Sequence, residues 1–240
     1  MKTLVVLPSY NERANLCELI RALLKTSPEV RVCVVDDSSP DGTSELIRQT
    51  TASEPEWPVR VHLITRLKKD GRGGAVRDGF AWGLNDRDIA YFVEMDCDFS
   101  HEPTAVPQGL AFLKNGADVA LGCRYPDGTI IGWPLQRRVF SFFANFLAKT
   151  LIDRRIPDYT NGFRFYTRRA VEVMASFPQT YKGYIYLSES LSHLLKAEMN
   201  IKCFSTVFKN RERGVSNTSL KEIFNALSGI FVIAKRHHAK

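Results

Sequence analysis

Short apolar runs alternate with segments of helical spacing along the first half of the chain. Apolar runs of strand length cover residues 3–8, 31–35, 59–65, 89–95 and 118–122. Intervening segments, such as residues 16–24 and 75–84, place their apolar side chains on one face of a helix. This alternation predicts an α/β fold with a mostly parallel central sheet and helices on both faces.

The second half of the chain is less regular. Helical patterns cover residues 135–152, 183–198 and about 219–236, and strand patterns cover residues 161–167 and 201–208. The first of these helices is unusually aromatic, with Phe140, Phe142, Phe143 and Phe146 beside Arg137 and Arg138. Because no repeat or linker interrupts the chain, we expect one catalytic domain over residues 1–218, followed by an amphipathic basic helix over residues 219–240.

The apolar strand at residues 89–95 ends in two acidic residues, Asp96 and Asp98. Open α/β sheets bind ligands at the carboxyl ends of their strands. Two carboxylates there suit Mg²⁺ or Mn²⁺, because Mg²⁺ keeps few protein ligands and takes others from substrate phosphates. An EF-hand loop is excluded, since its sixth position is His101 and its twelfth is Pro107. A solvated turn is the alternative for an isolated Asp-x-Asp.

Acidic residues also follow the first two strands, as Glu12 and as Asp36 and Asp37. Because the ends of parallel strands share one edge of a sheet, we expect these carboxylates to meet the Asp-x-Asp pair in one crevice. A divalent cation, a nucleobase or ribose hydroxyls would satisfy them, since unpaired carboxylates would repel one another. Helix capping is the alternative for Glu12 and Asp41.

The stretch Gly71-Arg72-Gly73-Gly74 lacks the Gly-Lys-Ser/Thr of a Walker A loop, and Val76 stands where a dinucleotide fingerprint needs Gly. We expect a flexible loop beside a phosphate here. The missing fingerprint disfavours a nucleotide-dependent reductase.

Charge is divided unevenly along the 240 residues. Residues 1–128 contain 15 Lys and Arg against 19 Asp and Glu, whereas residues 129–240 contain 18 against 7. A basic half favours an anionic partner, such as a phosphorylated substrate, an acidic membrane or a nucleic acid. A nucleic-acid-binding protein is a rival interpretation, but it gives the strand-end carboxylates no role, and we expect no nucleic-acid partner.

The five cysteines, at positions 17, 33, 97, 123 and 203, show no C-x-x-C or metal-type spacing, which predicts reduced side chains in or near the core. The longest apolar stretch, residues 223–234, is too short to span a bilayer. The N-terminus lacks a signal-peptide cleavage site. These features favour a cytoplasmic protein.

Six motifs follow one another along the chain: PSYNE at 8–12, VDDSSPDGT at 35–43, MDCDFSHEP at 95–103, GCRYPDG at 122–128, GWPLQRR at 132–138 and TNGFRFY at 160–166. Together they resemble the dolichol-phosphate mannose synthase group of family 2 glycosyltransferases. The resemblance implies a GT-A fold and an inverting, metal-dependent enzyme. It would transfer a hexose, with GDP-mannose the first expected donor, to a polyprenyl or dolichyl monophosphate. The same reaction with UDP-glucose or another UDP-sugar is the nearest alternative.

The resemblance also implies roles for individual residues. Contacts with the nucleotide-sugar fall on Pro8, Tyr10, Glu12, Val35, Asp37, Asp96, Cys97, Asp98, Arg124 and Arg211. The family's ligands of Mg²⁺ or Mn²⁺ match Asp96 and Asp98, and Ser100 is a further candidate ligand. Residues that contact the acceptor phosphate in the family match Arg124, Arg137 and Ser141. Its catalytic residues match Asp98, Arg124 and Arg137.

The chain departs from the family pattern at two places. The family's Gly-Leu-Gly after the third strand reads Gly71-Arg72-Gly73. The Lys that ends its late R-x-x-G-x-S-K pattern is Asn217, although Arg213 could supply the missing charge. These departures leave the reaction class intact and bear on the identity of the donor.

The implied chemistry needs no strong protein base, because a lipid monophosphate with a second pKa of about 6 is already a dianion at neutral pH. Arg124 and Arg137 would hold two anions close together, and the metal would neutralise the departing diphosphate. His101 is a candidate base, and a structural histidine is the alternative.

The predicted helices at residues 135–152 and 219–236 carry aromatic residues flanked by cations, as interfacial helices do. The basic tail at residues 235–240 adds attraction to anionic headgroups. Core packing of the Phe side chains is the alternative. We therefore expect peripheral contact with the cytosolic face of a membrane, directly or through a membrane-anchoring partner.

Overall fold

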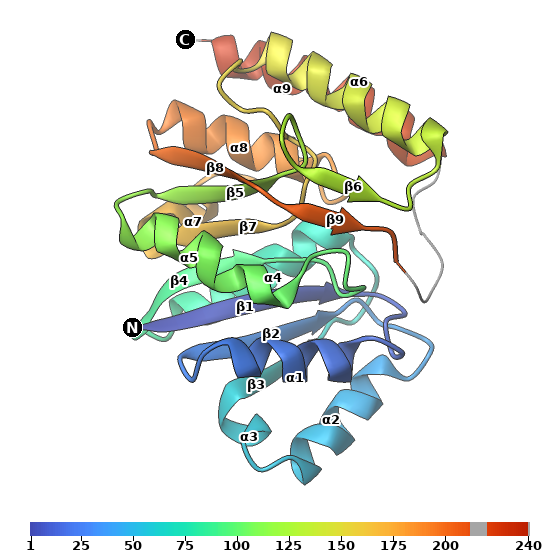
Figure 1. Cartoon of the computed structure of the whole chain (residues 1–240), viewed down its shortest axis with the longest axis vertical. Helices are drawn as coiled ribbons and strands as arrows, with labels where there is room; N and C mark the ends of the chain where they lie inside the picture. The colour runs from blue at the N-terminus through green and yellow to red at the C-terminus, as the bar shows by residue number, and fades with distance from the viewer. Residues whose placement is uncertain (212–219, 240) are drawn as a thin grey trace.

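A seven-stranded sheet with the order β3-β2-β1-β4-β7-β5-β8 forms the centre of the protein (Figure 1). The structure is a computed structural model that describes residues 1–211 and 220–239, and the side chains of residues 1–211 and 227–239. The strands of the sheet are β1 (Lys2–Ser9), β2 (Val30–Asp36), β3 (Val61–Thr65), β4 (Ile89–Glu94), β5 (Val119–Cys123), β7 (Arg164–Thr167) and β8 (Ile201–Ser205). Of these strands, β7 alone runs antiparallel to its neighbours, β4 and β5. The predicted mostly parallel sheet is confirmed.

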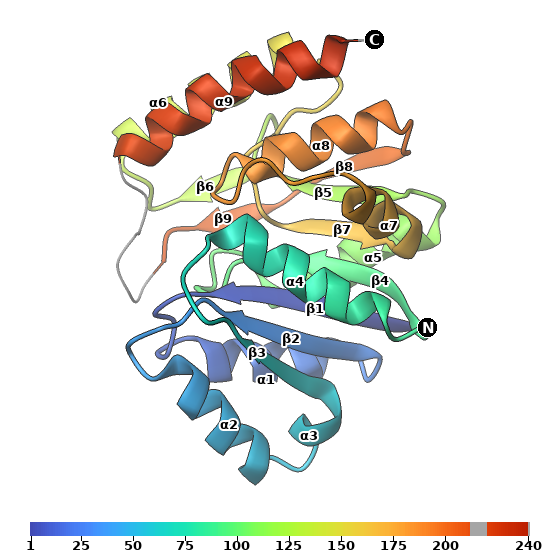
Figure 2. The same ribbon diagram turned by 180° about the vertical axis from the view of Figure 1, so that it is seen from behind.

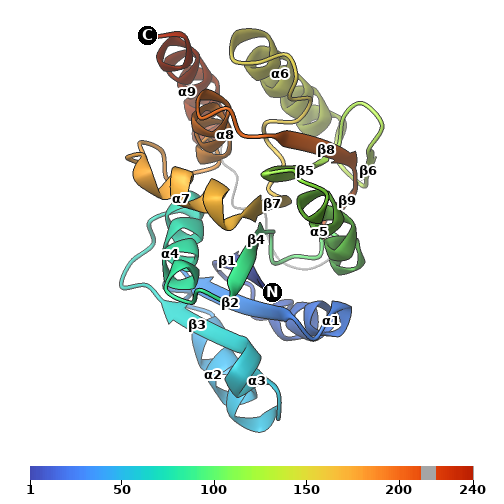
Figure 3. The same cartoon turned by 90° about the vertical axis from the view of Figure 1, so that its left-hand side faces the viewer.

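Helices cover both faces of the sheet, because side chains along each central strand alternate between two apolar clusters. In β1, Leu4 and Val6 join one cluster, whereas Val5 and Leu7 join the other. The first cluster lies under α4 (Arg72–Leu84), α7 (Arg168–Ser176) and α8 (Tyr186–Lys196), and the second under α1 (Leu16–Thr26), α2 (Thr43–Ser53) and α5 (Val106–Lys114). The end-on view separates α4, α7 and α8 from α1 and α5 (Figure 3).

Two long helices lie beside each other beyond β8 (Figure 2). They are α6 (Leu135–Leu151) and α9 (Leu220–His238). Ile230, Ile233 and Ala234 of α9 are buried in the cluster that also contains α4 and α8, so this helix is part of the fold. The domain boundary predicted between residues 218 and 219 lies outside the described residues. Across the described ranges, none of the helices has the length and apolar character needed to cross a membrane.

The predicted strand at residues 201–208 is wrong as a single element. It is two strands, β8 and β9 (Val207–Lys209), and β9 pairs in parallel with β6 (Thr129–Ile131) in a small second sheet. The change of partner occurs at Thr206, whose N–H donates to the Cys123 carbonyl while its own carbonyl accepts from the Thr129 N–H. The switch carries the chain after β8 toward the end of β4, where the acidic pair lies.

The predicted flexible glycine loop is also wrong over residues 72–74. Arg72, Gly73 and Gly74 form the first turn of α4, and the Gly73 N–H donates to the Lys182 carbonyl at 2.8 Å. Gly71 has a φ of +85°, which favours glycine, and it ends the preceding segment. The loop is therefore residues 66–71 alone, and its end is fixed by contacts with the segment before α8.

Other predicted boundaries shift by a few residues. A short helix, α3 (Trp57–Arg60), with Pro58 in its first turn, precedes β3, which therefore begins at Val61. The strand predicted over residues 161–167 begins at Arg164, because residues 158–161 form a turn in which the Asp158 carboxylate accepts from the backbone N–H groups of Thr160 and Asn161. A single 3₁₀ turn, η1 (Pro103–Ala105), leads into α5 as the Pro at its start favours.

Candidate active site

A crevice opens at the carboxyl ends of β1, β2 and β4, and we call it the strand-end crevice. Pro8, Tyr10 and Glu12 reach it from β1, Asp37 from β2, and the Asp-x-Asp segment from β4. Its complete lining is Pro8, Ser9, Tyr10, Glu12, Asp37, Lys69, Gly71, Arg72, Ala75, Asp96, Cys97, Asp98, Gly183, Tyr184 and Arg211. Eight of the residues predicted to contact a nucleotide-sugar, Pro8, Tyr10, Glu12, Asp37, Asp96, Cys97, Asp98 and Arg211, are thus brought together by the fold.

The Asp98 carboxylate is held in place by the turn that follows it. Its Oδ1 accepts hydrogen bonds from the Ser100 N–H at 3.0 Å and from the Ser100 hydroxyl. Phe99 has a φ of +59°, in the left-handed region, and this brings Ser100 back onto Asp98. The second oxygen, Oδ2, lies 3.0 Å from Nη2 of Arg211. Ser100, a candidate metal ligand from the sequence, therefore contacts Asp98 directly.

Four carboxylates, those of Glu12, Asp37, Asp96 and Asp98, line the crevice, and burial and nearby charges shift the pKa values of two of them. Burial raises the pKa of Glu12, and the negative charges of Asp98 and Asp96 raise it further, against a hydrogen bond from Asn15. Burial would also raise the pKa of Asp96, but the Arg72 guanidinium outweighs this effect and holds that pKa below its usual range. A cation is therefore favoured between these acids.

The residues in the crevice fit Mg²⁺ or Mn²⁺, which prefer carboxylate oxygens. Asp96 and Asp98 would hold the ion. In residues 1–211 and 227–239, no three His, Cys, Asp or Glu side chains are gathered closely enough to form a metal site by themselves. An ion held by two carboxylates would take its remaining ligands from substrate phosphates and water. The Cys97 thiol is a poor ligand for it, because its Sγ donates to the Pro8 carbonyl at 3.2 Å and burial holds its pKa well above the usual value.

Arg211 reaches the crevice because β9 runs beside the Asp-x-Asp turn. The Lys209 N–H donates to the Ser100 carbonyl at 3.1 Å, and Phe208 pairs with His101 across an isolated bridge. Arg211 then lies 3.7 Å from Glu12 Oε1 as well as against Asp98. Arg213 and Asn217, the two departures from the family in this segment, lie outside the described residues.

His101 has a structural position. It is fully buried, and its Nδ1 accepts from the Asp96 N–H at 3.3 Å while its Nε2 lies 2.9 Å from Asn161 Oδ1. Because the Asn161 amide group donates to the Gly122 carbonyl, its oxygen faces the ring, and Nε2 carries the proton. Burial lowers the pKa of His101, so the neutral ring is favoured. Both ring nitrogens are occupied, which argues against a role as general base.

Val35 and Arg124 are the two predicted nucleotide-sugar contacts that do not line the crevice, whereas Asp37 lines it with a carboxylate that is already hydrogen-bonded. Val35 is fully buried in the core and its side chain does not line the crevice. Asp37 lines it but is 3% exposed, and its carboxylate accepts from Arg66 Nη1 at 2.7 Å and from the Gly71 N–H at 2.9 Å. Asp37 thus ties the segment before α4 to the edge of the crevice.

Seven lining residues were not among the predicted site residues, and Lys69, Arg72 and Tyr184 have the largest side chains of these seven. The Lys69 ammonium lies 3.6 Å from the centre of the Tyr10 ring, which is close enough for a cation–π interaction. Tyr184 lines the crevice and is 41% exposed. The basic composition of residues 66–72 could have indicated Lys69, but no local pattern marks Tyr184.

The arginines predicted to bind phosphates lie at the side of the crevice nearest α6. Arg137 donates to Asn210 Oδ1 at 3.2 Å, and its guanidinium lies 4.1 Å from the centre of the Trp133 ring. Burial lowers the pKa of Arg137, and the positive charges of Arg211 and Arg124 add to this effect. Arg211 contacts Asp98 and Glu12, and Arg124 contacts a carboxylate of its own, whereas Arg137 donates to a neutral amide. Of the three arginines, Arg137 is therefore the one whose charge most favours an anion.

Arg124 has a carboxylate partner that the sequence did not reveal. Its Nε and Nη2 each donate to Asp158 at 2.8 Å, and both side chains are at most 4% exposed. A groove runs outward from Arg124 past Tyr125 to Val139 and Phe142 on α6. The hydroxyl of Ser141, the third predicted acceptor contact, is buried and has no hydrogen-bond partner among the described residues.

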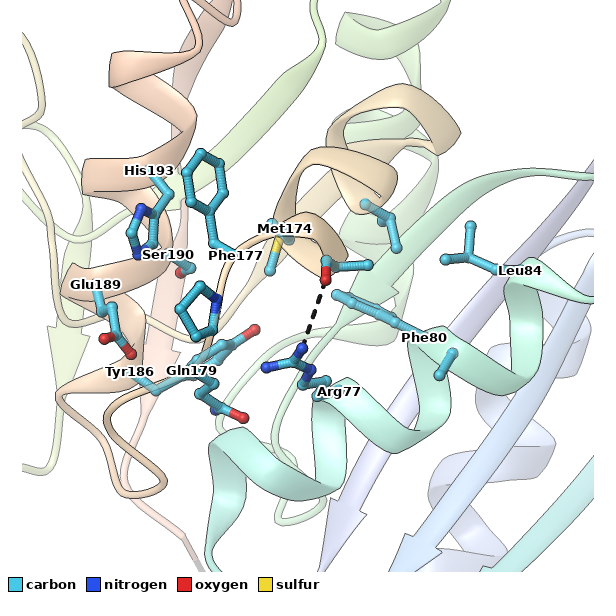
Figure 4. A pocket seen from close by; sticks show the side chains of 14 residues that line it. Arg77, Phe80, Leu84, Met174, Phe177, Gln179, Tyr186, Glu189, Ser190 and His193 are labelled. Carbon is cyan, nitrogen blue, oxygen red and sulfur yellow. Dashed lines mark hydrogen bonds between the residues drawn. The ribbon is translucent and has the colours of Figure 1, made fainter.

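A second recess lies between α4, α7 and α8, on the face of the sheet opposite α1 (Figure 4). Its lining is mainly apolar, with Phe80, Leu84, Met174 and Phe177 around it and Arg77 donating to the Ala175 carbonyl at 3.5 Å. Glu189 contributes the one carboxylate of this lining, and it accepts from the backbone N–H groups at 180 and 181. Because no second acid joins it there, we place the chemistry in the strand-end crevice.

Solved structures with this arrangement of strands and helices include glucosyl-3-phosphoglycerate synthase of Mycobacterium tuberculosis. Its complex with Mn²⁺, UDP and glucosyl-3-phosphoglycerate superposes with a TM-score of 0.68 at 16% identity, covering 98% of this chain and 79% of that one. The complex with Mn²⁺, UDP-glucose and phosphoglyceric acid gives a TM-score of 0.71 at 16% identity, over the same shares of the two chains. At this identity the likeness concerns the fold alone, and it confirms the expected GT-A fold.

Curated relatives are closer in sequence. A polyprenol monophosphomannose synthase of Mycolicibacterium smegmatis is 37% identical, over 94% of this chain and 84% of the relative. An undecaprenyl-phosphate mannosyltransferase of Micrococcus luteus is 34% identical, over 91% of this chain and 88% of the relative. A dolichol-phosphate mannosyltransferase of Pyrococcus furiosus is 32% identical over 98% of this chain, which spans 64% of that longer protein.

The resemblance to the dolichol-phosphate mannose synthase group is confirmed by these relatives. The model of the family described as glycosyl transferase family 2 matches residues 4–174, a range that includes β4, the Asp-x-Asp turn and all of β1 except its first two residues. The chain is therefore a glycosyltransferase and belongs to glycosyl transferase family 2.

Proposed function

We propose that this glycosyltransferase transfers a mannosyl group from GDP-mannose to a polyprenyl monophosphate, giving polyprenyl-phosphate mannose and GDP. The names of its curated relatives support the mannosyl group and the lipid phosphate acceptor. The observation that carries the proposal is that three surfaces of different character lie next to one another in the structure. A crevice lined by four carboxylates adjoins an arginine cluster, Arg124, Arg137 and Arg211, and this cluster adjoins α6, which has an exposed apolar face.

The nucleotide-sugar would bind along the strand-end crevice, with its base near Tyr10 and Lys69 and its diphosphate toward Asp98. Asp96 and Asp98 would hold Mg²⁺ or Mn²⁺, which neutralises charge on a departing diphosphate when it is bound. Arg211 lies against Asp98 and Glu12 and could transfer its hydrogen bonds to the diphosphate. The chain's own residues thus orient the donor and stabilise its leaving group.

The acceptor phosphate would bind at Arg137, which belongs to the arginine cluster. One of its oxygens attacks the anomeric carbon of the sugar as the bond from that carbon to the diphosphate breaks, which inverts the configuration. The phosphate is already ionised at neutral pH, so no proton has to be removed. Arg137 and Arg124 lower the repulsion between the acceptor phosphate and the donor diphosphate. Most of the rate acceleration comes from positioning and charge stabilisation.

The lipid chain would leave the cluster along the groove from Arg124 to Phe142. On α6, Leu135, Val139, Phe140, Phe142, Phe143 and Phe146 are exposed, with exposed fractions from 44% to 75%. Core packing, the alternative considered for the α6 phenylalanines, therefore does not account for them. An apolar helix face flanked by Arg138 and Lys149 is typical of contact with a membrane interface. We propose that α6 makes peripheral contact with the cytosolic face of a membrane.

Transfer of label from GDP-mannose into polyprenyl phosphate, followed by extraction into organic solvent, tests the proposed function. We expect label in the organic phase with GDP-mannose and Mg²⁺ or Mn²⁺, and none without the lipid phosphate. Faster transfer from UDP-glucose than from GDP-mannose would overturn the donor assignment. Absence of transfer from either donor to the lipid would overturn the proposed acceptor.

Substitution of Arg137 by Ala should weaken use of the lipid more than use of the donor. Loss of one charge-assisted contact to a phosphate is worth about 1.5–3 kcal/mol, so the KM for polyprenyl phosphate should rise roughly tenfold to a hundredfold. The KM for GDP-mannose should change less than about twofold. Arg155→Ala, which removes an exposed cation beyond the end of α6, is the matched control. An equal rise in both KM values would contradict the role of Arg137.

Carboxylates placed on the apolar face of α6 should reduce membrane binding. The pair Phe142→Glu and Phe146→Glu removes two exposed aromatic side chains, each worth about 1.5–3 kcal/mol when buried in an apolar environment. Cosedimentation with vesicles of phosphatidylcholine and phosphatidylglycerol should fall at least tenfold. The control pair Gln136→Glu and Thr150→Glu adds the same charge at exposed polar positions of α6. Equal losses in the two pairs would show that charge, and not apolar insertion, governs binding.

A further inference from the structure

Arg72 is the residue at which the glycine stretch departs most from the family, and it lies inside the strand-end crevice. Its side chain is 9% exposed. Nε donates to Asp96 Oδ1 at 2.9 Å, Nη1 to Glu94 Oε2 at 2.8 Å, and Nη2 to the Gly162 carbonyl at 3.2 Å. Each nitrogen of the guanidinium therefore has its own acceptor.

The partner at β4, Glu94, is a carboxylate that the fold buries completely. Its exposed fraction is 0%, and its Oε1 accepts from the Tyr166 hydroxyl at 2.6 Å. Burying a carboxylate without a cation is costly, so Glu94 depends on the positive charge of Arg72. Burial lowers the pKa of Arg72, but Asp96 and Glu94 outweigh it and hold that pKa above its usual value.

The position of Arg72 is fixed by glycines on either side. A Cβ at Gly162 would lie 2.3 Å from Arg72 Nη2, so a larger residue there would displace the guanidinium. A Cβ at Gly73 would lie 2.6 Å from the Tyr186 ring, which holds the first turn of α4 close to α8. The guanidinium is therefore built into a fitted site and does not swing freely at the surface.

This site determines the orientation of Asp96. Arg72 binds Oδ1, and the backbone N–H of Asp96 is used by His101. Within the described residues Oδ2 of Asp96 has no hydrogen bond, and its side chain is 25% exposed toward the crevice. One oxygen is thus held by the protein and the other is presented to whatever the crevice binds.

We propose that Arg72 is a positioning residue for the metal–nucleotide complex: it orients Asp96 so that Oδ2 faces the ion, and it neutralises Glu94 so that this orientation is stable. The inference rests on the proposed function, because it takes Asp96 as a ligand of Mg²⁺ or Mn²⁺. A partner that orients a metal ligand from outside the ligand set typically contributes about tenfold to a hundredfold in metal affinity.

The test measures Mn²⁺ binding in the presence of GDP, by the loss of the free-ion signal in electron paramagnetic resonance, and needs no sugar transfer. Arg72→Leu introduces the residue of the family pattern but leaves Glu94 buried without a cation, so its stability should fall. The double variant Arg72→Leu with Glu94→Gln removes that unpaired charge. Glu94→Gln alone keeps the contact between Arg72 and Asp96 and is the matched control.

We expect the double variant to unfold near the wild-type temperature and to bind Mn²⁺–GDP about tenfold to a hundredfold more weakly. Glu94→Gln should bind within about threefold of the wild type. Arg72→Lys in the Glu94→Gln background should recover only part of the loss, because an ammonium lacks the fork of a guanidinium.

Two outcomes would overturn the proposal, and they can be distinguished. A wild-type chain that does not bind Mn²⁺ with GDP would overturn the metal site itself, and with it the role of Arg72. A wild type that binds, together with a folded double variant that binds equally well, would overturn the role of Arg72 alone.

Discussion

Substitution of Asp98 by Asn should reduce sugar transfer by about a thousandfold while the chain stays folded. The amide oxygen can still accept from the Ser100 N–H and hydroxyl, so the turn at Phe99 should persist. The amide nitrogen, in contrast, offers no negative charge to a divalent cation and faces the Arg211 guanidinium. Loss of one strong charge-stabilising group costs roughly 10²–10³ in rate, and loss of the ion would add to this.

Initial rates of transfer with saturating donor would measure this effect, and circular dichroism would verify the fold. Asp41→Asn is the control, because the Asp41 carboxylate accepts from the Thr43 N–H just before α2 and does not line the crevice. Its activity should stay within about twofold of wild type. Undiminished transfer by Asp98→Asn, or by the wild type in excess chelator, would show that the acidic pair does not bind the metal.

Substitution of Asp158 by Asn should produce the largest loss of stability among the site variants. It leaves the buried guanidinium of Arg124 without its carboxylate, and breaking one member of such a pair typically costs about 3–5 kcal/mol. Urea unfolding would measure the loss in free energy of unfolding. Asp88→Asn removes an exposed pair with Lys2 and should leave the free energy of unfolding almost unchanged.

A double variant tests whether the lost charge balance is the cause. Replacing Arg124 by Met together with Asp158 by Asn removes both charges and keeps an acceptor oxygen for the backbone N–H groups at residues 160 and 161, so most of the stability should return. The ion pair of Arg124 and Asp158 also predicts how the stability of the wild type depends on pH. Burial would raise the pKa of Asp158, but Arg124 outweighs this and the folded pKa lies below its unfolded value. The stabilisation is then complete above about pH 4 and is lost as the pH falls through the lower, folded pKa. Acid unfolding of the double variant that matches wild type would contradict this.

The elements of the first half could be predicted because their patterns are local. The apolar run before Asp96 and the helical spacing of residues 16–24 need no knowledge of distant partners. The antiparallel direction of β7 could not be predicted, because its sequence is that of any buried strand and its direction depends on where the connection from α6 returns. The break at Thr206 follows from a change of partner between β5 and β6, which lie far away in the sequence.

The site shows the same division between local and distant information. The Asp-x-Asp pair and Glu12 could be placed in one crevice from their positions at strand ends. Arg72 could not, because its acceptors lie 22 to 90 residues away. One signal was present: Glu94 interrupts an otherwise apolar strand, and a buried carboxylate requires a cation. Nothing comparable in the sequence linked Arg124 to Asp158, which lies in a turn 34 residues later.

Diffraction from crystals grown with Mn²⁺ and GDP, with the anomalous signal of manganese used to locate the ion, tests the central claim most directly. We expect an anomalous peak within about 2.5 Å of a carboxylate oxygen of Asp98, with the diphosphate completing the ligands of the ion. We also expect Arg72 to remain bound to Oδ1 of Asp96. A complex in which GDP occupies the crevice and no manganese peak lies beside Asp96 or Asp98 would contradict the account.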